Sequence, residues 1–101
     1  METFGQTIKL KRENKGLLLR QVAAYLDIDQ AILCKIENGK RKACKTNILK
    51  LAEILECDKD NLMVHFLSEN IAFEIANEDC ASKALKAAEK KIKFIKSQIE
   101  R

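Results

Sequence analysis

The sequence predicts an all-α protein with a compact body of five helices and a helical extension at the C-terminus. Its 101 residues contain no proline and only three glycines, so few positions interrupt a helix. Apolar residues recur three and four positions apart along most of the chain, which is the period of an amphipathic helix. A hydrophobic content of 47% is enough for one small core. We expect residues 1–67 to form the body and residues 68–101 the extension.

The first predicted helix runs from about Thr3 to Asn14. Phe4 and Ile8 are its apolar anchors. Gly16 follows as a stop signal, because glycine adopts the left-handed conformation past a helix end without steric cost.

A second helix is predicted over residues 18–26, and a third begins after Asp29. Only Asp27 and Ile28 separate the two. Two short helices joined this tightly must cross steeply, which is the helix-turn-helix arrangement. The buried stripe of the second helix consists of Leu19, Val22, Ala23 and Leu26.

The third helix combines a capped start, an apolar underside and a basic end. Asp29 can accept hydrogen bonds from backbone N–H groups that have no partner within the helix. Leu33 and Ile36 are three positions apart and share a buried face. Gly39 stops the helix, and cations follow at once. These cations are Lys40, Arg41 and Lys42. Such a helix suits insertion into a DNA groove.

Two further helices complete the predicted body. The fourth is broken at Cys57, and the fifth begins at Asp58 or Asp60. The inner stripe of the fourth helix is Ile48, Leu51, Ala52 and Leu55. The inward residues of the fifth are Leu62, Met63, Phe66 and Leu67. Ser68 is then predicted to cap a short additional element, which carries Ile71, Phe73 and Ile75.

A long helix is predicted to begin at Asn77-Glu78-Asp79, a cap followed by two acids that favour the positive end of the helix dipole. Its apolar residues are spaced 4, 3, 4, 3 and 4, which is a heptad pattern. We call them the C-terminal seam: Ala81, Leu85, Ala88, Ile92, Ile95 and Ile99. The seam either packs against its own domain or pairs with a second subunit. For a dimer, the candidate interface is Phe66, Leu67 and Ile71 together with Leu85, Ile92, Ile95 and Ile99.

The residues that usually carry chemistry are sparse. The four cysteines lie 10, 13 and 23 positions apart, whereas zinc ligands usually occur in close pairs. Disulfides would require a secreted protein, so we expect free thiols that act as small apolar residues. The single histidine, His65, is expected on a helix surface or half-buried. Without a paired-carboxylate motif, a nucleophile with its base, or a phosphate-binding glycine loop, we expect no enzyme, metal or cofactor.

Charge is distributed unevenly although the net charge is only +4. Residues 35–50 carry six Lys or Arg against Glu37 alone, whereas residues 51–79 carry eight acids against Lys59 alone. A clustered basic patch indicates a polyanionic partner. No apolar run approaches the roughly 20 residues that span a bilayer, and no signal segment opens the chain. We therefore expect a cytoplasmic protein with no membrane association.

The stretch GLLLRQVAAYLDIDQAILCKIENGKRK resembles the core of XRE or Cro/repressor-type helix-turn-helix regulators. It matches the form G-L-x-L-x-x-[VL]-A-x-x-L-x-I-x-x-x-x-[LI]-x-x-[IL]-E-x-G-K-R. The likeness continues through NILKLAEIL and covers about residues 4–67. Within this family, the sequence of this stretch most resembles that of small bacterial regulators encoded beside DNA modification genes. The last thirty residues match no family motif.

The resemblance implies a role for individual residues. Arg12 and Glu37 match a partly buried ion pair. Core positions are matched by Val22, Ala23, Leu26, Ile28, Leu33 and Ile36. Positions facing the major groove are matched by Gln30, Ala31, Ile32 and Lys35. Positions near phosphates are matched by Leu19, Arg20, Asn38, Lys40 and Arg41. Because Lys42 and Lys45 are positively charged, we add them to the residues predicted to contact phosphates.

Two of these assignments have alternatives, and some positions depart from the pattern. Lys35 can reach a base or a phosphate, and Ile32 can serve a core or dimer contact instead. Leu18 and Cys44 stand where polar helix caps are usual, and Asp27 replaces the common turn glycine. Leu19 replaces a frequent glutamine, which leaves only its backbone amide for a phosphate.

The leading hypothesis is a sequence-specific DNA-binding transcriptional regulator, a repressor or autoregulator, that binds a pseudo-palindromic operator as a homodimer. One alternative is an antitoxin-type protein that also neutralises a partner toxin through its C-terminal helix. Another is a helical adaptor that has kept the fold without binding DNA.

Overall fold

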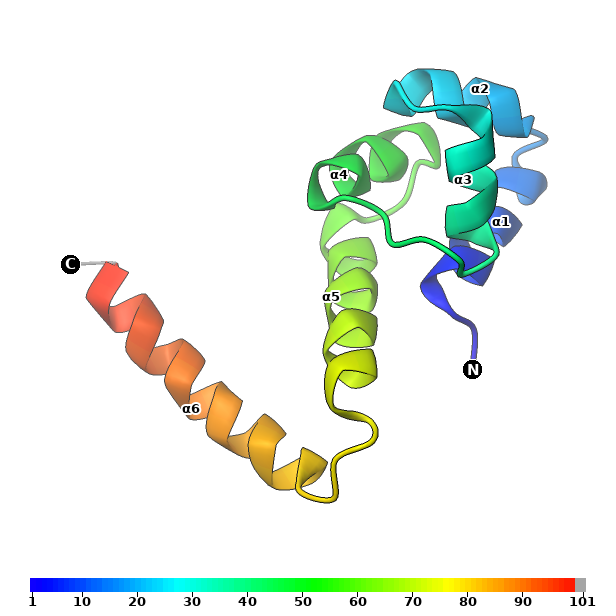
Figure 1. Ribbon diagram of the computed structural model, residues 1–101. Coiled ribbons are helices and arrows are strands. Elements are labelled where there is room, and N and C mark those ends of the chain that lie inside the picture. Colours follow the sequence, from blue (N-terminus) through cyan, green and yellow to red (C-terminus); the bar gives the residue numbers. More distant parts are fainter. Residues whose placement is uncertain (100–101) are drawn as a thin grey trace. The chain divides into compact units, whose positions relative to one another are not determined.

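A computed structural model describes residues 1–99, which form six helices joined by short turns (Figure 1). The helices are α1 (Phe4–Asn14), α2 (Leu19–Leu26), α3 (Gln30–Glu37), α4 (Lys45–Ile54), α5 (Lys59–Ile75) and α6 (Ala81–Ile99). The all-α class is confirmed. The chain divides into two compact units, residues 1–70 and a second unit that starts at Ile71. None of the helices described here is both long and apolar enough to cross a membrane.

Local capping signals account for most helix boundaries in the first unit. The side chain of Thr3 accepts a hydrogen bond from the backbone of Gln6, whose side chain accepts one from the Thr3 backbone. Asp29 caps α3 by accepting from the Ala31 backbone N–H at 3.1 Å. Asp27 adopts φ 57° and ψ 44°, the left-handed geometry that the short turn requires. The predicted cap and turn are both confirmed.

Helices α2 and α4 begin without a side-chain cap, as expected from the residues that precede them, Leu18 and Cys44. Leu18 has no side-chain acceptor, and instead its backbone N–H donates to the Gln21 side chain at 2.8 Å. Cys44 precedes α4 without a side-chain hydrogen bond to the helix. Both helices therefore depend more on packing than on capping for their stability.

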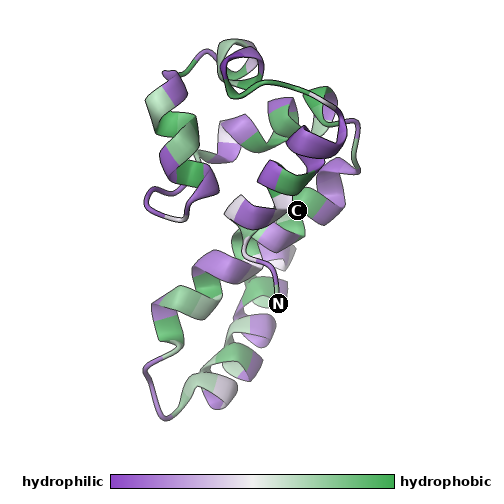
Figure 2. Cartoon of the chain, turned by 90° about the vertical axis from the view of Figure 1, so that its right-hand side faces the viewer, coloured by the Kyte–Doolittle hydropathy of each residue, from purple (hydrophilic) through white to green (hydrophobic). Residues whose placement is uncertain are grey.

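The core of the first unit lies between α1, α2, α3, α4 and the first half of α5. Apolar and polar residues alternate along these helices (Figure 2). Buried apolar residues from all five helices form one cluster. Leu33 and Ile48 are fully buried at its centre. The other buried apolar residues are Phe4, Ile8, Val22, Ala23, Leu26, Ile36, Ala43, Leu51, Ala52, Leu55, Leu62 and Phe66. Of the core residues predicted for α2 and α3, Val22, Ala23, Leu26, Leu33 and Ile36 are confirmed, whereas Leu19 and Ile28 pack against this core half-buried.

A close approach between α1 and α3 depends on Gly5. A Cβ at this position would overlap the Ile36 carbonyl oxygen and come within 2.5 Å of the Glu37 carbonyl oxygen. Only glycine therefore lets α1 lie against the end of α3.

The prediction of a separate element capped by Ser68 is wrong. Helix α5 continues through Ser68 to Ile75, and the Ser68 hydroxyl donates to the His65 carbonyl at 3.1 Å. Serine can satisfy its hydroxyl inside a helix in this way, so it need not start one. Leu67, expected to point inward, is exposed on α5.

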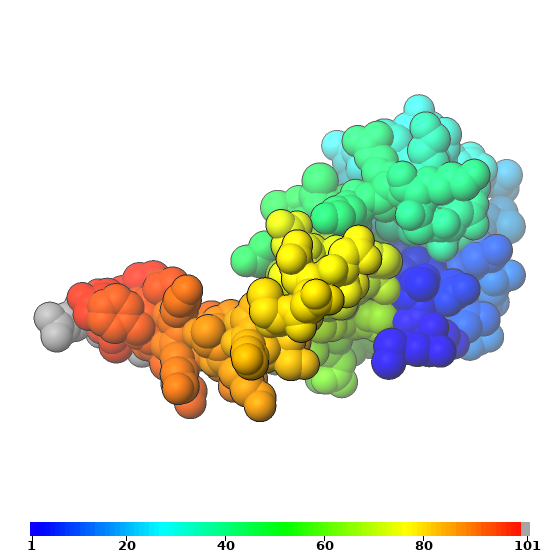
Figure 3. Space-filling view, turned by 60° about the horizontal axis from the view of Figure 1, so that its bottom comes forward, coloured from blue at the N-terminus to red at the C-terminus, as the bar shows by residue number. Residues whose placement is uncertain are grey.

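The last helix begins later than predicted. Residues 76–80 form a turn, in which Glu78 donates to the Ile75 carbonyl and Ala81 donates to the Glu78 carbonyl. The acids Glu78 and Asp79 therefore precede α6 and do not form its first turn. No residue of α6 is buried, and its surface can be followed from orange to red in Figure 3.

The cysteines are free thiols. Only Cys57 packs against the core, while Cys34, Cys44 and Cys80 are exposed. The expectation that all four act as small apolar residues is therefore wrong for three of them. Among residues 1–99, no group of three or more potential ligands is arranged to hold a metal ion. His65 is half-buried, which is one of the two arrangements expected for it. Its ring contacts that of Phe4 edge-on, with 5.9 Å between the ring centroids.

Candidate nucleic-acid interface

Helix α3 is held by one side and free on the other. Leu33 and Ile36 are buried, which fixes the helix against α1 and α2. Gln30 and Ala31 in the first turn are exposed, as is Lys35 one turn later. Because i and i+4 residues lie on the same side of a helix, Ala31 and Lys35 share one exposed strip. Three of the four predicted base-contacting residues thus lie together on the free surface of α3.

Ile32 differs from the other three. It is half-buried and packs against the core. This placement corresponds to the alternative of a core contact. The structure therefore separates Ile32 from the exposed strip.

An ion pair joins the end of α3 to α1. Arg12 Nε lies 2.8 Å from Glu37 Oε2, and Arg12 Nη2 donates to Glu37 Oε1 at 3.1 Å. Arg12 Nη1 also donates to the Leu17 carbonyl at 2.9 Å. The hydrogen bond to Glu37 raises the pKa of Arg12, despite the opposing effect of burial. The pair implied by the resemblance is present, and both side chains are largely shielded from water.

This ion pair leaves the neighbouring cations uncompensated. Glu37 is the one acidic residue between positions 35 and 50, and its carboxylate is directed inward to Arg12. We call the exposed cations that follow α3 the basic cluster: Lys40, Arg41, Lys42 and Lys45. Within residues 1–99, the two ion pairs that form are Arg12–Glu37 and Lys15–Glu56, so no member of the basic cluster is paired there.

The chain reaches the basic cluster through Gly39. Gly39 has φ +75° and an open surrounding, so the backbone turns away from α3 at this point. The Lys40 N–H donates to the Lys35 carbonyl at 2.8 Å, which holds the turn in place. The cations therefore start from a defined position at the end of α3.

The remaining predicted phosphate contacts lie at the start of α2 and at the end of α3. Arg20 is exposed, whereas Leu19 is half-buried and packs against the core. As the first residue of α2, Leu19 has a backbone N–H without an intrahelical acceptor. Asn38 is exposed, and its amide lies 3.5 Å from the sulfur of Cys34. Cys34 was not anticipated here, although its spacing of four from Gln30 was a sufficient signal.

The predicted dimer contacts divide between core and surface. Phe66 is buried in its own unit, edge-on to Phe4 at 5.5 Å, so its assignment to an interface is wrong. Phe66 follows Leu62 by four positions and shares its inward side. The other assigned residues are exposed: Leu67, Ile71, Leu85, Ile92, Ile95 and Ile99. Sequence analysis missed the exposed Val64, which precedes Leu67 by three positions on the same helix.

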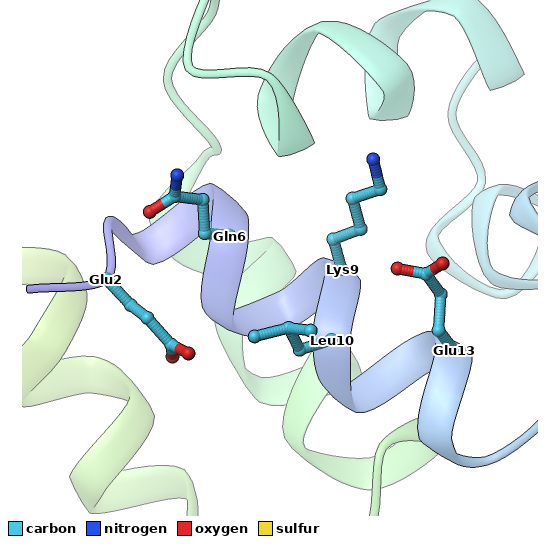
Figure 4. Close-up of a pocket in the computed structure, with 5 residues that line it drawn as sticks. All are labelled: Glu2, Gln6, Lys9, Leu10 and Glu13. Atoms are coloured by element: carbon cyan, nitrogen blue, oxygen red, sulfur yellow. The ribbon is translucent and has the colours of Figure 1, made fainter.

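A shallow depression on α1 is separate from these surfaces. It has a volume of about 390 Å³ and is lined by Glu2, Gln6, Lys9, Leu10 and Glu13. Figure 4 shows Gln6, Lys9 and Glu13 pointing to one side of α1. The Gln6 side chain already accepts the Thr3 backbone hydrogen bond, so capping explains its place.

Comparison with known proteins places residues 8–62 in a family described as helix-turn-helix. The chain is 41% identical over 64 residues to the HTH-type transcriptional repressor RghR of Bacillus subtilis (strain 168). It is 42% identical over 64 residues to the uncharacterized HTH-type transcriptional regulator RghRB of the same organism. These alignments cover 62% of this chain and 47% and 46% of the relatives, so the chain spans about half the length of the curated relatives it matches.

A solved structure is also similar. It is the restriction-modification controller protein C.AhdI from Aeromonas hydrophila, with 34% sequence identity and a TM-score of 0.54. The superposition covers 58% of this chain and 89% of the controller protein. The similarity therefore extends over somewhat more than half of this chain and most of the controller protein.

Proposed function

The chain belongs to the helix-turn-helix family, and we propose that it is a DNA-binding transcriptional regulator that recognises a pseudo-palindromic operator as a homodimer. A repressor or autoregulator is the favoured form, since one relative is named a transcriptional repressor. We also propose that the protein binds DNA without catalysing a reaction. It would do so in the bacterial cytoplasm, where the DNA is located.

The observation that carries the proposal is the arrangement of charge around α3. The only acid near the helix end is turned inward to Arg12, while four cations remain exposed beside the free strip of α3. A phosphate backbone would meet cations, and base edges would meet the strip. Contacts to phosphates set the register and much of the affinity, whereas contacts to bases set the sequence preference.

The side chains on the strip suit the major groove. Gln30 can make two hydrogen bonds to adenine, and Ala31 can contact a thymine methyl group. Lys35 can donate to guanine acceptors or to a nearby phosphate. Because Ile32 packs on the core, we assign it to positioning the helix and not to reading bases.

Phosphate binding is assigned to the groups at the edges of α2 and α3. The basic cluster and Arg20 supply the charge, while Asn38 and the Leu19 backbone N–H supply neutral donors. If each subunit neutralises about four phosphates, the logarithm of the binding constant of a dimer should fall with the logarithm of salt concentration with a slope near about −7.

A dimer is proposed because one recognition helix reads few base pairs. Helix-turn-helix dimers place two such helices about 34 Å apart on one side of the duplex. Helix α6, whose large apolar residues are exposed, is the segment best suited to join two subunits.

The test is a titration of the protein on its own upstream DNA and on random DNA at two salt concentrations. The expected result is a clear preference for the upstream sequence and a steep salt slope. Arg41→Ala removes one phosphate contact from each subunit, so it should weaken binding to both DNAs alike and make the slope of the dimer shallower by about 2. Lys59→Ala is the matched control, since it removes an exposed lysine outside the basic cluster. A native slope shallower than about −2 would contradict the proposal.

The exposed α6 also supports a second candidate, an antitoxin that neutralises a partner protein. In that case α6 would be covered by a different protein and not by a second copy. A small protein that copurifies in equimolar amount and whose toxicity the chain suppresses would favour this function.

A further inference from the structure

Helix α6 exposes an apolar stripe that nothing else in the described part of its own unit, residues 71–99, buries. Its residues Leu85, Ile92 and Ile95 are each 44–52% exposed. In proteins, most of the stability of an amphipathic helix comes from the packing of its apolar face, so α6 should gain most of its stability from whatever covers this stripe.

We propose that the C-terminal seam pairs with the same seam of a second copy in antiparallel orientation, about a two-fold axis at Lys90. The inference rests on the homodimer in the proposed function and specifies its orientation and register. Two features of α6 support it: the order of small and large residues along the seam, and the length of the helix.

Residue volumes along the seam are complementary to those of a reversed copy. In an antiparallel pair centred on residue 90, Ala81 meets Ile99 and Ala88 meets Ile92 of the second copy. The remaining layer sets Leu85 against Ile95 of the second copy. Each alanine thus faces an isoleucine, and all six seam positions are used on both helices. Every layer thus contains at least one large side chain and none consists of two alanines, which favours close packing along the interface.

A parallel pair in register lacks this match. It would stack Ala81 on Ala81 and Ala88 on Ala88, which makes one thin layer at the end of the seam and one between two thick layers. It would also place isoleucine at both seam positions of the second half, a pattern that favours assemblies larger than dimers. The layer volumes therefore favour the antiparallel pair.

The charges beside the seam do not reverse this choice. In a parallel pair, Lys91 lies beside Lys96 of the second copy along both edges. In the antiparallel pair, the like-charge contacts are one between the two Lys91 residues and one between the two Glu89 residues. Glu89 also precedes Lys93 by four positions on its own helix, which offsets its charge locally. Each orientation thus carries two like-charge contacts.

The length of α6 also fits two half-sites on DNA. Nineteen residues rise about 28 Å, so an antiparallel pair sends the two chains back to their first units from points about that far apart. This separation approaches the spacing of about 34 Å between half-sites. A parallel pair would start both connections from the same end.

Disulfide trapping distinguishes the two orientations. The starting chain carries Cys34→Ser, Cys44→Ser and Cys80→Ser, and it keeps the half-buried Cys57 as a constant background. Into it we place Leu85→Cys in one sample and Ile95→Cys in another. A disulfide needs Cα atoms within about 7 Å, whereas residues 85 of two antiparallel copies lie about 15 Å apart along the axis.

The expected result is a linked dimer in the mixture of the two chains, about tenfold above either chain alone. A second pair, Ala81→Cys with Ile99→Cys, removes only one large residue and should behave in the same way. Linked dimers from each chain alone would show a parallel pair and overturn the proposal. Absence of linkage in both mixtures would also overturn it, as would a starting chain that sediments as a monomer.

The DNA titration of the starting chain separates this inference from the proposed function. Sequence-preferring DNA binding without linkage would overturn the antiparallel pair alone. Linkage in the mixtures without any preference for the upstream DNA would overturn the regulator function and leave the pair supported.

Discussion

Gly5 of α1 lies directly against the backbone of Ile36 at the end of α3, with no space for a side chain between them. This contact brings α1 against the helix that carries the candidate DNA-binding strip. The position of α3 relative to α1 is therefore set partly by Gly5, a residue that has no side chain.

Gly5→Ala should destabilise the fold by about 1–3 kcal/mol, because the added methyl group overlaps the Ile36 carbonyl. Alanine normally stabilises a helix relative to glycine by up to about 1 kcal/mol, so the sign itself is informative. Denaturant unfolding measures the change. Gly39→Ala is the comparison, because it has open space and only the backbone cost of a positive φ. A Gly5→Ala variant as stable as the native chain would contradict the close contact.

Gln30→Ala should reduce the preference for the cognate site by about 1–3 kcal/mol per half-site while leaving binding to random DNA nearly unchanged. The reason is that Gln30 is exposed in the first turn of α3 and carries no structural hydrogen bond among those the structure describes. Competition binding with single-base variants of the operator measures the preference. Equal loss on cognate and random DNA would remove Gln30 from base reading.

Cys34 should be protected from alkylation by cognate DNA. Its thiol is exposed one turn after Gln30 on α3, where a bound duplex would cover it. Mass spectrometry after a brief maleimide treatment, with and without DNA, measures the rate for each thiol. Cys80, which lies outside the helix-turn-helix, should react at the same rate in both cases. Unchanged reactivity of Cys34 on cognate DNA would contradict the proposed contact surface.

Ile92→Asp with Ile95→Asp should give monomers that bind the operator about 10²-fold more weakly, because two linked contacts become independent. Sedimentation and DNA titration measure the two effects. Ala87→Asp with Ser97→Asp adds the same charge to α6 away from the seam and should leave the dimer intact. If the seam variant sediments like the native chain, α6 does not join the subunits.

Tyr25 should ionise at higher pH in the folded protein than in the unfolded chain. Its hydroxyl donates to Glu53 Oε2 at 2.6 Å, and this hydrogen bond, with burial and the negative charge of Glu53, raises its pKa above the ordinary value of about 10. The stabilisation is thus present below pH about 10 and is lost as the pH rises through the folded-state pKa.

Phenolate absorbance reports this shift directly, because Tyr25 is the only tyrosine and the chain has no tryptophan. Glu53→Gln keeps an acceptor but removes the charge, so it should move the pKa back toward the ordinary value. Equal titration of the folded and unfolded protein would contradict the contact.

The sequence was most informative where structure is decided locally. Asp29 caps α3 because its short carboxylate reaches the next backbone amides, and Asp27 tolerates the left-handed turn. The same reasoning failed at Ser68, because a serine can cap a helix or bond back to an earlier carbonyl in the middle of one. Which of these occurs depends on the residues around it.

Features that depend on packing between helices were harder to predict. The spacing of Phe66 and Leu67 did not show that one is buried and the other exposed, since that depends on which elements cover α5. Gly5 carried no signal, because the α3 backbone beside it is distant in sequence. For the candidate DNA-binding surface, the resemblance indicated Gln30, Ala31 and Lys35, but the core contact of Ile32 became apparent only from the structure.

The bidentate clasp between Arg12 and Glu37 has a practical consequence for solution experiments. Its side chains are 13% and 5% exposed, and mobile ions screen such a sheltered pair far less than contacts made in open water. Raising the electrolyte concentration should therefore strip the protein from nucleic acid while the scaffold under α3 stays intact. A salt series then measures release alone, without a hidden contribution from melting.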